Sequence, residues 1–222
     1  MFGDLEIIIS KFIEEHYATL PIAYDWRFST DNFPGKKFRV QGNNPYEQSK
    51  KLRLYIHSAI KRNGLLTADY QKWYVRYWGG VRGNKESTIE AYINMSEVDL
   101  ERLGAKGIAT WSKILCLRDP NRFAIYDARV ALAINSLQKR EDIKSPLLFP
   151  QLPSRNNTFV VPAQRTISNS VFFAGRRLNN FYSVYMQLLQ RAAERGPWDI
   201  QDIEMALFSY SSSLSEVWLT DN

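Results

Sequence analysis

The chain has 222 residues, of which 45% are hydrophobic, and this length and composition suit a globular protein with a sizeable core. Its net charge of +6 and its pI near 9.3 favour a polyanionic partner such as nucleic acid. One cysteine, Cys116, excludes a disulfide framework and a cysteine-ligated iron–sulfur cluster, and without a membrane-length apolar run or a signal-peptide opening we expect a soluble, cytoplasmic protein.

The N-terminal half reads as a series of amphipathic helices joined by loops. The helices predicted from apolar periodicity and capping residues cover residues 4–17, 50–62, 68–78, 86–95 and 97–103. Thr67 and Asn84 are candidate N-caps for the third and fourth of these, and Ser96 with Asp99 resembles a capping box at the start of the fifth. Three prolines and two glycines over residues 21–45 predict an irregular loop.

The C-terminal half contains one long proline-rich segment between predicted helices. Four prolines between residues 145 and 162 indicate a loop, which we expect to form the rim of a pocket. A long helix is predicted over residues 176–195, and Asp199 is the expected N-cap of a final helix that runs to about residue 210. No internal repeat or low-complexity tract divides the chain.

Residues 104 to 135 hold the pattern with the most chemical content. Gly104 and Gly107 can supply the positive φ angles of a tight turn between two helices, and the N-terminus of the second helix would offer free N–H groups to a phosphate. Farther on, Asp127 occupies the N-cap position of a helix predicted over 127–137. The pattern thus predicts a phosphate-binding hairpin followed by a carboxylate fixed at a helix start.

The segment Trp73–Gly83 mixes aromatic residues with arginine and ends in glycines. Such a surface can stack on bases or insert into a duplex, so Arg82 is a candidate DNA contact, although burial in the core explains much of the same pattern. His57 falls between the apolar positions of its helix and is expected to face water. No cluster of histidine, cysteine and carboxylate residues has the spacing of a metal site.

Two short segments resemble the helix–hairpin–helix DNA glycosylase superfamily, and within it the small bacterial proteins of 8-oxoguanine glycosylase fold. Residues 107–111, GIATW, stand in the place of the family's hairpin, and residues 125–127, IYD, in the place of the segment that ends in its essential aspartate. The resemblance implies that Gly104, Lys106, Gly107 and Ala109 hold the DNA backbone, that the target base is flipped into a pocket, and that Asp127 assists cleavage of the glycosidic bond.

The sequence departs from the family pattern at two points, and these leave the nucleophile open. Ala109 replaces the second hairpin glycine, and the interval from hairpin to aspartate is about one helical turn short. Alignment on the hairpin puts Trp111 at the position of the family's lysine, which implies a base-releasing enzyme with Trp111 against the base. Alignment on Asp127 lets Lys106 or Lys113 take that role. Because Trp111 and Lys113 lie about 200° apart around a helix, they cannot both face one pocket.

The expected fold is all-α, a single compact protein over residues 1–222 with two helical lobes, an interlobe cleft, a helix–hairpin–helix at 98–118 and C-terminal helices over 176–210. The leading hypothesis is a monofunctional DNA N-glycosylase with Asp127 catalytic and Trp111 in the base pocket, and it requires no metal or organic cofactor. The resemblance also implies a role in defence against phage DNA. The alternatives are a non-catalytic helix–hairpin–helix module that binds nucleic acid, and a glycosylase that is also a lyase through Lys113. A basic helical protein with a protein partner is a third possibility.

Overall fold

The computed structural model describes residues 3–35, 39–62, 64–154, 157–168, 178 and 180–219. Over these residues the regular structure is helical and contains no β-strand, so the predicted all-α class is confirmed. The N-terminal helix and the final helix follow the predicted apolar periodicity closely.

The helices have between 4 and 17 residues, and their connections range from short turns to the long segment between Ala23 and Pro45. In chain order they are α1 (Gly3–His16), α2 (Leu20–Ala23), α3 (Pro45–Lys61), α4 (Thr67–Trp73), α5 (Glu86–Asn94), α6 (Glu97–Arg102), α7 (Ile108–Arg118), α8 (Ala128–Arg140), α9 (Asn157–Ser168), α11 (Phe181–Ala193) and α12 (Ile200–Ser215). Three single turns complete the set: η1 (Tyr17–Thr19) and η3 (Glu216–Trp218), which are 3₁₀, and η2 (Tyr74–Trp78), which is π-helical.

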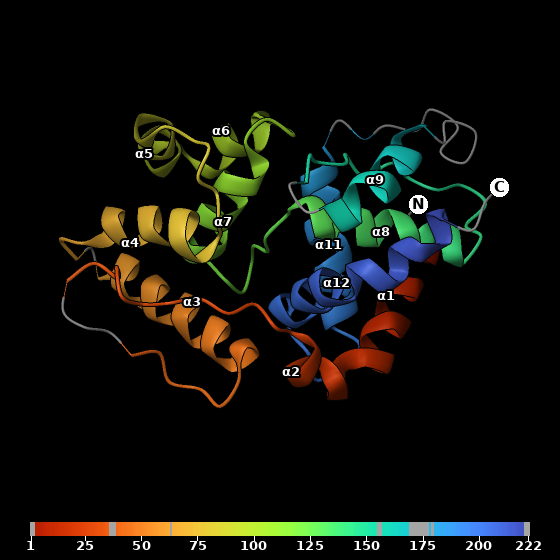
Figure 1. The fold of residues 1–222 in the computed structure, drawn as a ribbon, viewed down its shortest axis with the longest axis horizontal. Helices are drawn as coiled ribbons and strands as arrows, with labels where there is room; N and C mark the ends of the chain where they lie inside the picture. Colours follow the sequence, from red (N-terminus) through yellow and green to blue (C-terminus); the bar gives the residue numbers. More distant parts are fainter. Residues whose placement is uncertain are drawn as a thin grey trace.

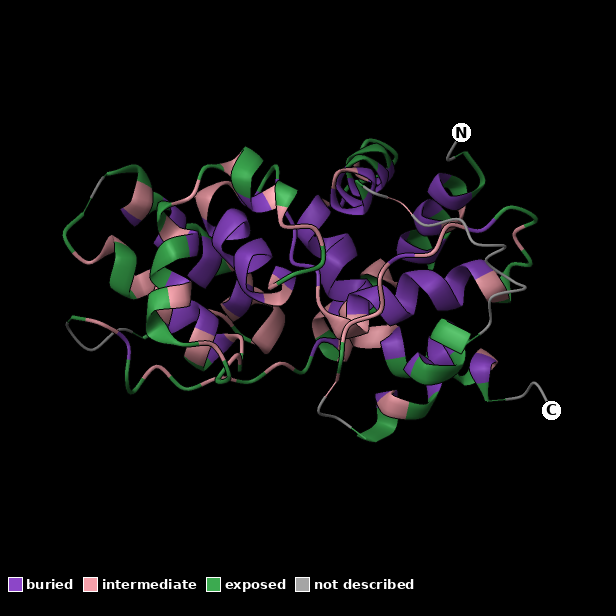
Figure 2. Ribbon diagram, turned by 90° about the horizontal axis from the view of Figure 1, so that it is seen from above, coloured by how far each residue is buried: buried purple, intermediate pink, exposed green. Residues whose placement is uncertain are grey.

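The helices gather into two groups that lie side by side (Figure 1). Helices α3 to α7 form one group, and α1, α2, α8, α9, α11 and α12 form the other. The largest hydrophobic cluster takes side chains from both groups, among them Ile89 and Trp111 from the first and Tyr185 and Leu189 from the second. Buried residues accordingly run through the middle of the molecule, while exposed ones lie on its outer surfaces (Figure 2).

Two aspartates begin the two helices that pack most closely against each other. Asp127 and Asp199 are the N-caps of α8 and α12, and each side chain accepts hydrogen bonds from two backbone amides of its own helix. These bonds satisfy donors that every helix leaves unpaired at its start. Both predicted caps are therefore confirmed as caps.

The turn η2 departs from the α-helical pattern predicted over 68–78. Here the amide of Gly79 donates to the carbonyl of Tyr74, 2.7 Å away and five residues earlier. This bond closes a π-helical turn, which holds one more residue than an α-helical turn. As a result Tyr74, Val75 and Trp78 are all buried, and Gly79 lies against helix α7.

The segment predicted as a loop over 145–162 is only partly a loop. Helix α9 begins at Asn157 and carries Pro162 in its interior. Its buried residues are Phe159, Pro162, Ala163 and Thr166, whose spacing is that of one helix face. The prediction was wrong because three of the four prolines precede α9 and only Pro162 lies within it. The predicted helix over 176–195 is α11 where described, from Phe181, while residues 176 and 177 lie outside the described residues.

Three side chains have other roles than those predicted. Leu66, not Thr67, is the N-cap position of α4, and Lys85 precedes α5 because Asn84 donates its amide to Thr110 Oγ1 instead. His57 is buried, not exposed, and its Nδ1 lies 3.2 Å from the carbonyl of Leu117. The cap at Ser96 is confirmed, since its hydroxyl accepts from the amide of Asp99.

Candidate functional site

The turn between α6 and α7 depends on two glycines in left-handed backbone conformations. Gly104 has φ of 56° and Gly107 has φ of 71°, a region that side chains disfavour. A Cβ atom on Gly107 would lie 2.3 Å from the hydroxyl of Tyr92, so no larger residue fits there. Lys106 is exposed on this turn, and Ala109 is half-buried in the first turn of α7.

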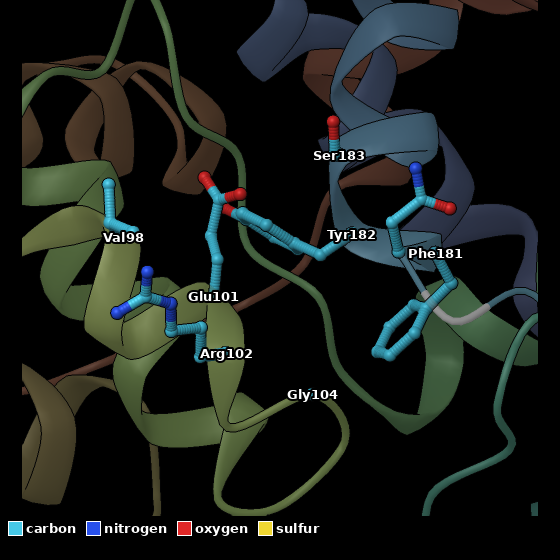
Figure 3. Close-up of a pocket in the computed structure, with 8 residues that line it drawn as sticks. Val98, Glu101, Arg102, Gly104, Phe181, Tyr182 and Ser183 are labelled. Atoms are coloured by element: carbon cyan, nitrogen blue, oxygen red, sulfur yellow. The ribbon is translucent and has the colours of Figure 1, made fainter.

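A cavity of about 310 Å³ separates this turn from the start of α11 (Figure 3). Gly104 and Arg102 line one wall, and Phe181 and Tyr182 line the other, with the ring of Tyr182 pointing toward α6. Glu101 also lines it, and burial raises the pKa of its carboxyl group. A carboxylate in the wall disfavours a phosphate, so this cavity is a poorer anion site than its glycines alone suggest.

A second cavity lies between the two groups of helices and brings the chemically interesting residues together. Its lining residues are Tyr24, Trp26, Trp78, Gly79, Lys113, Ile125, Asp127, Glu204 and Phe208. Its free volume is about 30 Å³, which holds one or two water molecules. We call it the Lys113 cavity. It contains one amine and two carboxyl groups inside a largely aromatic wall.

Lys113 reaches this cavity from the second half of α7 and is only 4% exposed. Its Nζ donates to the carbonyl of Ala109 over 2.7 Å. Its aliphatic stem lies directly on Gly79, where an added Cβ would be 2.5 Å from Cε of Lys113. Burial lowers the pKa of the Lys113 amine, although the charges of Asp127 and Glu204 act against this shift. A lysine in this state supplies a neutral amine more readily than a solvated one.

Asp127 lines the same cavity from the start of α8. The amides of Arg129 and Val130 donate to its Oδ1 over 2.9 and 3.0 Å. Both bonds end on one oxygen, so the cap does not use Oδ2. The positive end of the α8 dipole stabilises the negative charge of this carboxylate. Asp127 is thus both a helix cap and a half-buried anion at the cavity.

Glu204 is the second carboxyl group of the cavity, and it is paired with a buried arginine. Arg53 Nη1 donates to Glu204 Oε2 over 2.5 Å, and Arg53 Nε donates to the hydroxyl of Tyr74 over 2.9 Å. The guanidinium lies 5.3 Å from the ring centre of Trp78. Burial raises the pKa of the Glu204 carboxyl group, and the charge of Arg53 opposes that shift.

Trp111 lies elsewhere, which corrects the expectation that it lines the pocket of Asp127. The side chain is fully buried, its Nε1 donates to the carbonyl of Lys106, and its ring packs against Tyr182 with centres 4.8 Å apart. The indole therefore fills the core between α7 and α11. Of the two residues that cannot share one pocket, the structure places Lys113 beside Asp127.

Arg82 lies on an exposed loop after η2 and does not line the Lys113 cavity. Tyr77 is 55% exposed, so an aromatic residue and an arginine of the segment Trp73–Gly83 remain open to solvent. Cys116 is a buried core residue, and burial raises the pKa of its thiol to about 12. The thiol therefore stays protonated near neutral pH.

Sequence reasoning missed Tyr24, Trp26, Glu204 and Phe208, although one signal for Glu204 was present. Ile200, Ile203 and Leu207 define the buried face of α12, and Glu204 lies on that face. A carboxyl group on an apolar helix face requires a partner or a function. The other three residues come from distant segments, and only the fold brings them to Lys113.

Within the described parts of the chain, no group of histidine, cysteine and carboxylate residues has the arrangement of a metal site. The described helices include none with the length and apolar character needed to cross a membrane. In comparisons with known proteins, no family model matches the sequence, and neither a curated protein nor a solved structure matches it.

Proposed function

We propose that the protein is a DNA N-glycosylase that removes a modified base, with Lys113 as the nucleophile and Asp127 as the assisting carboxylate. The observation that carries the proposal is the single cavity in which a buried lysine with a lowered amine pKa faces a carboxylate fixed at a helix start. A buried amine with a lowered pKa that shares a cavity with a carboxylate is a candidate catalytic site.

In the proposed reaction the Lys113 amine attacks C1′ of the sugar while the bond from C1′ to the base nitrogen breaks. The electron pair of that bond leaves with the base, which takes up a proton. Asp127 stabilises the positive charge that develops on the sugar. The sugar ring then opens as a proton moves from the nitrogen to the ring oxygen, and this gives a protonated imine between Lys113 and C1′, from which strand cleavage can follow.

The rest of the molecule supports DNA as the substrate. The net charge of +6 favours a polyanion, and the turn of Gly104 and Gly107 presents the N-terminus of α7 beside the exposed Lys106. The Lys113 cavity, with a volume of about 30 Å³, is too small for a base in this conformation. Entry of a flipped base requires movement of the half-buried residues at the rim of the Lys113 cavity, among them Trp26 and Phe208.

The test is a screen of duplex oligonucleotides that each carry one modified base, with base release and borohydride-trapped adducts measured in parallel. We expect one or more duplexes to yield both a free base and a covalent adduct on Lys113. Lys113→Arg keeps the charge and should form no adduct, and Lys106→Ala should weaken DNA binding while the adduct still forms. Binding across the screen without base release would contradict the proposal and favour a non-catalytic nucleic-acid-binding module.

A second candidate, base release by water alone, is favoured by the size of the cavity. Its volume of about 30 Å³ holds a water molecule next to Asp127. In that mechanism Asp127 orients the water that attacks C1′, and Lys113 only contributes charge. Base release that persists in Lys113→Met and disappears in Asp127→Asn would favour this monofunctional enzyme over one with a lysine nucleophile.

A further inference from the structure

Three of the residues that line the Lys113 cavity, Lys113, Asp127 and Glu204, are ionisable, and Arg53 pairs with Glu204 behind the wall, so the charges of these four groups balance. Lys113 and Arg53 are cationic when protonated, and Asp127 and Glu204 are anionic when ionised, so the four together carry no net charge. They come from four different helices or their caps: α7, α3, α8 and α12. Two other groups near Lys113 and Glu204, the thiol of Cys116 and the phenol of Tyr24, have raised pKa values and stay neutral.

A lysine nucleophile must lose a proton before it attacks, and this would leave the buried group with an excess negative charge. Uncompensated charge in a cavity of this kind is costly. The cost is avoided if the proton moves to a carboxylate of the same group, because the net charge then stays at zero. The identity of that carboxylate follows from the hydrogen bonds of Asp127 and Glu204.

Asp127 is poorly suited to accept the proton. Two backbone amides donate to it, and the N-terminus of α8 favours its negative form. Glu204 is different, because Arg53 holds it through Oε2 only, with no second bond of a bidentate pair. Arg53 Nη2 is buried and has no hydrogen-bond partner among the described residues. Oε1 of Glu204 is therefore not committed to Arg53.

We propose that Glu204, anchored by Arg53, accepts the proton of Lys113 through water in the cavity. The proton leaves Nζ of Lys113 for a water molecule, and that water passes a proton to Oε1 of Glu204. The electron pair stays on Nζ, and Oε2 continues to accept from Arg53. The lowered pKa of Lys113 and the raised pKa of Glu204, each caused mainly by burial, favour this direction of transfer.

This inference rests on the proposed role of Lys113, so its first test uses no DNA. Infrared titration of the whole protein detects a protonated carboxyl group, and Glu204→Gln identifies the band of Glu204. We expect Lys113→Met to move the midpoint of this band to higher pH, because the positive neighbour is lost. Glu101→Gln is the matched control, since Glu101 also has a raised pKa but lies outside the cavity, and it should leave the band unchanged.

The second test is the rate of borohydride trapping on a duplex with an abasic site, measured against pH. In Glu204→Gln we expect the rate at neutral pH to fall at least tenfold and to increase with pH, because hydroxide must then remove the proton. Circular dichroism and thermal melting check that the variant is folded.

A Glu204 band whose midpoint is the same in wild type and Lys113→Met would overturn the inference, whatever the DNA assay shows. If the band moves but no duplex forms an adduct with the wild type, the shared proton stands and the glycosylase proposal fails. If Glu204→Gln does not fold, the Lys113→Met titration still decides, because among the described residues Lys113 bonds to a backbone carbonyl and forms no salt bridge that the substitution would break.

Discussion

Asp127 and Asp199 begin two helices in nearly the same way, and their surroundings differ. Each carboxylate accepts two amide hydrogen bonds through Oδ1 at distances of 2.9 and 3.0 Å. Asp199 completes a capping box with Asp202, and its Oδ2 pairs with Lys50. Asp127 has no such box, and it faces a cavity. The cap itself therefore does not distinguish a structural aspartate from a candidate catalytic one.

The lysine beside each aspartate shows the same contrast. Lys50 bonds to Asp199 and Asp202, and these carboxylates raise the pKa of its amine in spite of partial burial. Lys113 donates to a carbonyl group instead, and burial lowers its pKa. A lysine in an ion pair is held as a cation, whereas a buried lysine near but not bonded to carboxylates can release its proton. We expect reactivity only at Lys113.

The largest effect that tests this contrast is loss of the lysine. Lys113→Met should abolish the covalent adduct with abasic DNA, a decrease of at least a thousandfold, because methionine keeps the bulk and removes the amine. The matched change Lys50→Met should leave the adduct rate within about twofold of wild type and cost roughly 3 kcal/mol of stability, because it leaves the buried Asp202 carboxylate without its cationic partner. Borohydride trapping followed by gel analysis measures both. Equal adduct formation by wild type and Lys113→Met would show that Lys113 is not the nucleophile.

The aspartates offer the next largest effect. Asparagine is a good N-cap residue. Asp127→Asn and Asp199→Asn should therefore each change the free energy of unfolding by no more than about 1 kcal/mol. Base release should fall about a hundredfold in Asp127→Asn, because the charge that stabilises the sugar is lost, and should not change in Asp199→Asn. Single-turnover rates on the best duplex from the screen measure this. A similar decrease in both variants would show that the effect is structural.

Gly79 provides a smaller effect through the position of Lys113. In Gly79→Ala the new Cβ would lie 2.5 Å from Cε of Lys113 and must displace its stem. We expect the trapping rate to fall about tenfold, together with a loss of stability, because the same Cβ would lie 2.9 Å from the backbone carbonyl oxygen of Val75. Gly64→Ala is the control, because its nearest contact would be an ordinary 3.7 Å. The prediction is wrong if the two alanine variants trap DNA equally well.

The smallest effect is on stability against pH. The folded-state pKa of Lys113 is below the 10.5 of an unfolded lysine, so between these values the unfolded chain binds more protons. Stability from this group is therefore complete above 10.5 and is lost as pH falls toward the lowered pKa. Lys113→Met should remove this slope. Urea unfolding at several pH values measures how the free energy of unfolding depends on pH. Parallel plots of this free energy against pH for wild type and Lys113→Met would contradict the prediction.

The sequence predicts the helices of this protein better than it predicts the candidate site. The amphipathic period alone is sufficient to predict α1 and α12. The N-caps Asp127 and Asp199 are local features, so they can also be predicted from the sequence. The face of α7 could not be predicted, because nine of its eleven residues are buried and apolar period cannot choose between Trp111 and Lys113. That choice depends on what packs against α7 on each side, namely Tyr182 and Gly79.

The π-helical turn η2 gives Gly79 its place beside Lys113, and such a turn is equivalent to one residue inserted into an α-helix. The insertion rotates everything after it by about 100° relative to an uninterrupted helix. Deletion of Tyr77, whose side chain is 55% exposed, would reverse that step and rotate the buried Trp78 together with Gly79. The glycine would then turn away from the lysine, and one length change in the chain would separate the reactive amine from its support. Borohydride trapping on the deletion variant would show whether one inserted residue was enough to create this site.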